Sequence, residues 1–277
     1  MDIPYIDTDF GIIGGAVVGI FFFLSGYGME WKREKKSLKL IELPSRIGKL
    51  FYQLIIPTIL FYTVTYVHGN SIYETSVKII TGNFCTLPYS WFISTLCVLY
   101  FLFHISAKIT KKYFFICLFG FIALLHIICV TLNIPLHIYL SNFAFLSGVL
   151  YKHYESRIVN LQLPYLKLFC ILCLGLLTIF AMKFSDEIRP LYRFIWTSIF
   201  MILYSTVPLI RVNHYGRYLN SIGLQLYLCQ GIAFVLIPIE SCNGSLRTIF
   251  IIGLTLIIAS LVNWLYTQVH VFLKTRL

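Results

Sequence analysis

The chain has 277 residues, of which 58% are hydrophobic and only 12% are charged, and its mean hydropathy is +0.83. These values exclude a water-soluble domain, because ordinary soluble domains carry about twice that share of charged residues. The formal net charge of +11 does not indicate nucleic-acid binding, because the basic residues lie in short loops between apolar segments, as they do in membrane proteins.

The apolar segments predict an all-α, polytopic membrane helix bundle that forms a single domain over residues 1–277. We expect the first span to break at Ser25-Gly26-Tyr27-Gly28 and to run directly into basic residues. The outer loop 68–88 is long enough for a short amphipathic or re-entrant piece. We expect about nine spans, with the span at 137–151 the shortest: 10–29, 50–67, 90–107, 113–132, 137–151, 166–182, 191–210, 221–239 and 248–272.

The basic residues predict the orientation of these spans. If the N-terminus lies outside, all but five of the 22 Lys and Arg residues fall in inner loops or at inner helix ends. Such a bias marks the cytoplasmic side, so we expect an outside N-terminus and an inside C-terminus. The acidic residues Asp2, Asp7 and Asp9 occupy the place where a secretory signal peptide would need positive charge. The five outer residues are Lys78, Lys183, Arg189, Arg193 and Arg247.

Residues 31–49 form the densest basic segment and hold seven cations. One interpretation is that they set the topology and contact anionic lipid head groups. The other is that they bind the phosphates of a cofactor such as coenzyme A, although the segment has no glycine-rich turn to bind phosphate through backbone amides.

Few polar side chains lie within the spans. His126 is the most deeply placed imidazole, and a histidine there more often bonds a neighbouring helix than acts as a catalyst. No two histidines have metal-ligand spacing, and Cys170 and Cys173 lie in an apolar span without further ligands, so we predict no metal site. A disulfide between Cys85 and Cys242 is not expected.

Three further features concern packing. Pro57 and Gly148 predict local kinks or close helix contacts. Ser221, Tyr227 and Gln230 lie on one span, but their spacing does not place them on a single polar face.

Five segments, taken in order, resemble the acyltransferase-3 family of integral membrane O-acyltransferases. Residues 18–28, VGIFFFLSGYG, resemble the end of that family's second helix and include Ser25 and Gly26. Three further stretches resemble later segments of the family's sequence pattern. They are Arg46 to Leu50 with Pro57, Trp91 to Ile93 with Tyr100, and FAFLSGVLY at 143–151, which contains Gly148. Residues 219–230, LNSIGLQLYLCQ, resemble a Gly-x-x-Ser…Tyr-Leu-x-His segment, with Gln230 where the family often has histidine.

The resemblance implies an enzyme of the bacterial inner membrane that moves an acyl group, usually acetyl, from acyl-CoA to a carbohydrate hydroxyl. It implies acyl-CoA as a donor substrate and no tightly bound cofactor. Arg33, Arg46 and Lys49 would bind the donor. The partners would be membrane lipids and a glycan or lipid-linked glycan acceptor, and the oligomeric state stays open.

The chain departs from the family at its start. The family's usual ten-helix architecture has an inside N-terminus and a catalytic histidine on the first helix, and no Arg/Lys-x10-His precedes Gly11. We therefore expect a chain that is N-terminally incomplete relative to the family and that has little or no acyltransferase activity as written; if it does acylate a glycan, His126 is the first candidate for the general base. The alternatives are an inactive family member and a transporter or flippase of polysaccharide precursors.

Overall fold

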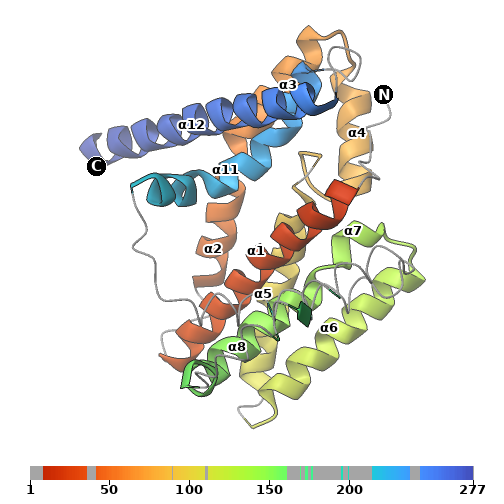
Figure 1. The fold of residues 1–277 in the computed structure, drawn as a ribbon, viewed down its shortest axis with the longest axis vertical. Helices are drawn as coiled ribbons and strands as arrows, with labels where there is room; N and C mark the ends of the chain where they lie inside the picture. Colours follow the sequence, from red (N-terminus) through yellow and green to blue (C-terminus); the bar gives the residue numbers. More distant parts are fainter. Residues whose placement is uncertain are drawn as a thin grey trace. The chain divides into compact units, whose positions relative to one another are not determined.

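All the regular structure in the described part of the chain is helical (Figure 1). The computed structural model describes residues 9–35, 42–88, 90–109, 112–160, 214–237 and 244–276, with isolated positions at 169, 172, 173, 176, 195 and 199. Its helices are α1 (Asp9–Glu34), α2 (Glu42–Tyr52), α3 (Ile55–Val67), α4 (Ile72–Asn83), α5 (Trp91–Ile109), α6 (Phe114–Thr131), α7 (Leu136–Tyr139), α8 (Asn142–Asn160), α11 (His214–Leu236) and α12 (Gly244–Arg276).

The membrane character expected from composition is borne out. Four helical segments in the described residues are long and apolar enough to cross a bilayer: Leu43–Val67, Trp91–Ile109, Phe114–Thr131 and Thr248–Val269. The predicted spans at 166–182 and 191–210 fall almost entirely outside the described residues. The count of nine spans and the orientation of the termini therefore stay predictions.

The expected break in the first span is wrong, because α1 continues through Ser25-Gly26-Tyr27-Gly28 to Glu34. A helix keeps its backbone hydrogen bonds inside the segment, so glycines without a proline do not end it in an apolar setting. The span predicted at 137–151 is also different, because the short helix α7 precedes α8, and α8 continues to Asn160. Hydropathy marked only the apolar part of α8, whereas its helix runs on through charged residues.

The described helices form two compact units. Unit 1 comprises Met1–Leu43 and Thr95–Ile210, and in it α8 packs along α1 and α6. Unit 2 comprises Pro44–Ser94 and Arg211–Leu277, and in it α11 packs against α12 and α3. The prediction of a single domain over the whole chain stays a prediction.

The pairing of α1 with α8 in unit 1 depends on two glycines. Both helices contain the sequence Phe-Leu-Ser-Gly, at 23–26 and at 145–148, and they run in the same direction (Figure 1). Gly26 lies against the backbone carbonyl of Phe145, and Gly148 lies against that of Phe23, so a methyl group on either glycine would overlap the opposite carbonyl. Small residues permit this close backbone approach between membrane helices.

In unit 2, the helix predicted at 50–67 is interrupted between α2 and α3. Pro57 lies in the first turn of α3, where its ring excludes the carbonyl of the residue four positions earlier, Gln53, from a helical bond. The Tyr266 hydroxyl of α12 accepts a hydrogen bond from the Ile56 amide at 3.1 Å and donates one to the Tyr52 carbonyl at 2.8 Å. A side chain from another helix thereby satisfies backbone groups that the interruption leaves without helical partners.

The outer loop predicted at 68–88 contains the short helix α4. The Ser71 hydroxyl caps its first turn by accepting a hydrogen bond from the Glu74 amide at 3.4 Å. Phe84 ends the helix in a left-handed conformation. A helix in this loop agrees with the short piece that the sequence predicted there.

Candidate functional site

A cluster of charged side chains lies where the C-terminal end of α1 meets α8. We call it the charged cluster; its members are Tyr27, Glu30, Arg33, Glu34, Lys152, His153 and Glu155. The close contact of Gly26 and Gly148 sets the two helices near enough for side chains one or two turns further along to meet.

Glu30 is the buried centre of the charged cluster. Its side chain is 0% exposed, and Arg33, one turn later on α1, donates to both of its carboxylate oxygens at 2.6 Å. The Arg33 guanidinium also lies over the Phe114 ring of α6, 4.2 Å from its centroid. This bidentate pair partly offsets the cost of burying a carboxylate.

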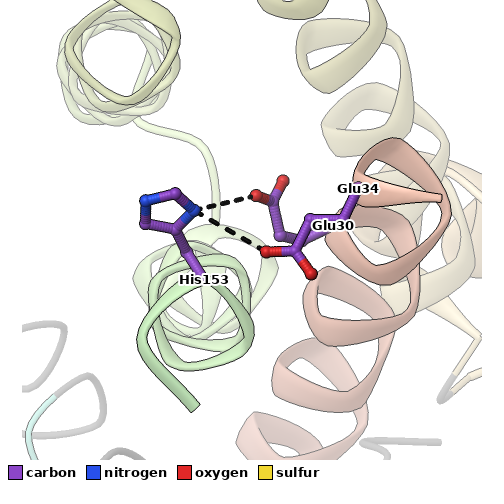
Figure 2. A group of neighbouring side chains, drawn as sticks. All are labelled: Glu30, Glu34 and His153. Carbon is purple, nitrogen blue, oxygen red and sulfur yellow. Dashed lines mark ion pairs between the residues drawn. The ribbon is translucent and has the colours of Figure 1, made fainter. Parts of the chain in front are cut away.

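His153 of α8 approaches two carboxylates of α1 from the side (Figure 2). Its Nδ1 lies 3.6 Å from Glu30 Oε1 and 3.7 Å from Glu34 Oε1. The other ring nitrogen points away from both carboxylates (Figure 2). The Phe115 ring packs on the imidazole, with the two centroids 4.6 Å apart.

Lys152 and Glu155 extend the charged cluster along α8. The Lys152 ammonium donates to Glu155 Oε2 at 2.6 Å and lies 3.5 Å from Glu34 Oε2, while the Tyr27 hydroxyl donates to Glu155 Oε1 at 3.0 Å. The hydrogen bond to Glu155 raises the pKa of Lys152, so this side chain remains an ammonium at neutral pH.

The deepest histidine of the predicted spans has a different environment. His126 is half-buried on α6, between the rings of Tyr139 and Phe143, whose centroids lie 4.8 Å and 5.7 Å from its own. Its buried Nδ1 makes no hydrogen bond within the described residues. Buried His104 on α5 has its Nδ1 2.8 Å from the Tyr100 carbonyl one turn earlier, and its Nε2 makes no hydrogen bond within the described residues.

The structure places the three predicted donor-binding cations on two helices. Arg33 belongs to unit 1 and is held by Glu30. Arg46 and Lys49 belong to unit 2 and lie three residues apart on α2, which puts them on one side of that helix. Residues 36–41 between the two helices lie outside the described residues.

Among the predicted motif residues, the structure brings Gly26 and Gly148 together, and half-buried Ser25 precedes that contact. Tyr100 is buried beside Phe145, with ring centroids 6.2 Å apart. Trp91 is buried at the start of α5 in unit 2.

The three predicted residues of α11 do not gather. Ser221 is exposed, and its hydroxyl donates a hydrogen bond to the Tyr218 carbonyl at 2.7 Å. Half-buried Tyr227 packs edge-on against Phe92, with the two ring centroids 4.9 Å apart. Gln230 is half-buried. Their separation agrees with the expectation that they share no single polar face.

Sequence reasoning missed Glu30, Glu34 and His153 as a group. The spacing of the two glutamates, four residues apart on one helix, was a readable signal for a shared face. It also missed the buried Gln225 amide of α11, which donates to the Gln53 side chain at the interruption between α2 and α3. Both arrangements join segments that are far apart in the sequence.

Comparison with known proteins gives one match. Residues 2–267 match the profile of the family described as "Acyltransferase domain" (Acyl_transf_3). This range includes parts of both compact units. No curated protein and no solved structure matches the chain.

Proposed function

Since this chain belongs to the acyltransferase-3 family, we propose that it is a membrane O-acyltransferase that moves an acetyl group from acetyl-CoA to a hydroxyl of a cell-envelope carbohydrate. The family match over residues 2–267 is the observation that carries this proposal. The four apolar helices support a place in the membrane, and we propose the bacterial inner membrane with the C-terminus inside.

The donor is a water-soluble polyanion, so preplaced cations near the membrane surface favour its binding. Arg46 and Lys49 present two positive charges on one side of α2, and Arg33 lies in the last turn of α1, within the basic segment 31–49. Arg46 is half-buried, which restricts its guanidinium more than that of a fully exposed arginine.

The transfer itself needs a base. The acceptor hydroxyl oxygen attacks the thioester carbonyl, an ester C–O bond forms, the C–S bond breaks and the CoA thiol leaves with a proton. We assign removal of the hydroxyl proton to His126, because its Nδ1 has no hydrogen bond within the described residues and its place in an apolar span shields it from water.

Replacing His126 with alanine tests the function and this assignment together. Membrane vesicles that contain the chain should transfer radiolabelled acetyl groups from acetyl-CoA to endogenous glycan, and H126A should lower the rate by about 100-fold or more. His68→Ala is the matched control, because that imidazole is exposed and bonded to its own helix through the Val64 carbonyl.

The sidedness of the reaction gives a further control. Inverted vesicles should use added acetyl-CoA, whereas right-side-out vesicles should not. Absence of transfer by a folded wild-type chain in either preparation contradicts the proposal and favours an inactive family member or a transporter of polysaccharide precursors. Full activity of H126A would show that a group other than His126 removes the hydroxyl proton.

Arg46→Ala should raise the KM for acetyl-CoA by about tenfold, the effect of losing about 1.4 kcal/mol of a charge-assisted contact, and should leave kcat within about twofold. Steady-state kinetics in the same vesicles measure both values. Lys78→Ala is the control, because Lys78 lies on α4 in the predicted outer loop. An unchanged KM would limit Arg46 to topology and lipid contact.

A further inference from the structure

We propose that Glu30, Glu34 and His153 form a binding site for one divalent transition-metal ion, with Zn²⁺ and Mn²⁺ as the best chemical fits. Two carboxylates and one imidazole are ligands that these ions accept. The site goes beyond the proposed acyl transfer, and no step of that reaction passes through it.

The three potential ligand atoms converge without bonding to one another. They all lie within 4.8 Å of each other, and His153 Nδ1 is 3.6 Å from Glu30 Oε1 and 3.7 Å from Glu34 Oε1. Both separations are too long for a hydrogen bond. They are close to the roughly 3.4 Å between neighbouring ligands of a tetrahedral ion with bonds of about 2.1 Å. The two carboxylate oxygens lie within 4.8 Å of each other, so they would have to approach by at most about 1.4 Å to bind the same ion.

Two cations hold the carboxylates in this orientation from outside the ligand set. Arg33 donates to both oxygens of Glu30, and a carboxylate oxygen has a second lone pair that remains available. Lys152 lies 3.5 Å from Glu34 Oε2, which leaves Glu34 Oε1 on the His153 side. Such outer partners commonly fix the orientation of metal ligands.

The helix pair makes the ligands rigid, and the local charge favours a cation. Glu30 is fully buried, and the Gly26 and Gly148 contacts fix α1 against α8 within two turns of the site. Three carboxylates of the charged cluster, including that of Glu155, face the two cations Arg33 and Lys152, so one negative charge remains when His153 is neutral. The two cations make the site weaker than a closed zinc centre of four protein ligands.

The test is a Co²⁺ titration of the full chain, purified in detergent without an oligohistidine tag and followed by visible absorption. Wild type should bind one Co²⁺, and Zn²⁺ should displace it. Glu34→Gln and His153→Gln should each weaken binding by at least about tenfold. Glu30 stays unchanged in these variants, because its loss would disturb the buried pair with Arg33.

The matched controls are Glu74→Gln and His68→Gln, which change the same residue types at exposed positions and should leave Co²⁺ affinity within about twofold. Wild-type thermal unfolding gives a reading that needs no variant: the midpoint should rise with Zn²⁺ and return after EDTA. Absence of one-to-one binding, equal affinity in all four variants, or a midpoint indifferent to Zn²⁺ overturns the proposal and leaves an ion-pair cluster only. Acyl transfer is not measured here, so its failure would not affect this result.

Discussion

Replacing Gly26 with alanine should lower the free energy of unfolding by about 3 kcal/mol, because the new methyl group overlaps the Phe145 carbonyl and the two helix backbones must move apart. The carbonyl belongs to the backbone and has no flexible end that can turn aside. Gly148→Ala should act in the same way through the Phe23 carbonyl. Thermal or denaturant unfolding in detergent, followed by tryptophan fluorescence, measures both effects.

Gly28 provides a control two residues further along the same helix. A methyl group there meets no atom within 4 Å, so Gly28→Ala should be neutral or stabilising by up to about 1 kcal/mol through helix propensity. Gly120→Ala on α6 is a second control with the same open surroundings. Equal stability of G26A and G28A would show that the α1–α8 contact accommodates a methyl group at position 26.

Arg33→Ala should cost about 3 kcal/mol or more of stability, because it leaves the fully buried Glu30 carboxylate without its bidentate partner. The same unfolding measurement applies. Adding Glu30→Gln to R33A should recover part of the loss, since the amide carries no charge to leave unpaired, and the double-mutant cycle gives the coupling between the two residues.

Arg157→Ala on α8 is the control for loss of an arginine from the same unit. That side chain is exposed and lies 5.7 Å from the Tyr154 ring, so its removal should change stability by less than about 0.5 kcal/mol. A loss no larger for R33A than for R157A would contradict a stabilising role for the buried pair.

Much of the helical architecture could be predicted from the sequence, because hydropathy alone reveals segments that bury their own backbone bonds in lipid. The ends of helices were less predictable. At Ser25–Gly28, glycines that suggested a break serve instead as a contact surface for α8. At Lys152–Asn160, polarity suggested a loop, but charged residues continue α8 beyond its apolar part.

In the candidate site, the sequence could predict the local contacts but not the contacts between helices. The pair of Glu30 with Arg33 is a local i,i+3 contact, which sequence spacing can suggest. Nothing local indicates His153 as their neighbour, because its position depends on how α8 aligns with α1, and that alignment follows from backbone contacts at Gly26 and Gly148. The aromatic surroundings of His126 depend in the same way on the packing of α6 against α7 and α8.

The ion pair of Glu30 with Arg33 also affects how the chain enters the bilayer during synthesis. Roughly 120 residues separate α1 from the His153 turn of α8, an interval of about ten seconds at ordinary translation rates. Throughout that interval α1 carries a carboxylate whose partners on α8 do not yet exist. Arg33 is synthesised only three residues after Glu30. The nascent α1 can therefore neutralise the Glu30 carboxylate by itself, before His153 of α8 is synthesised.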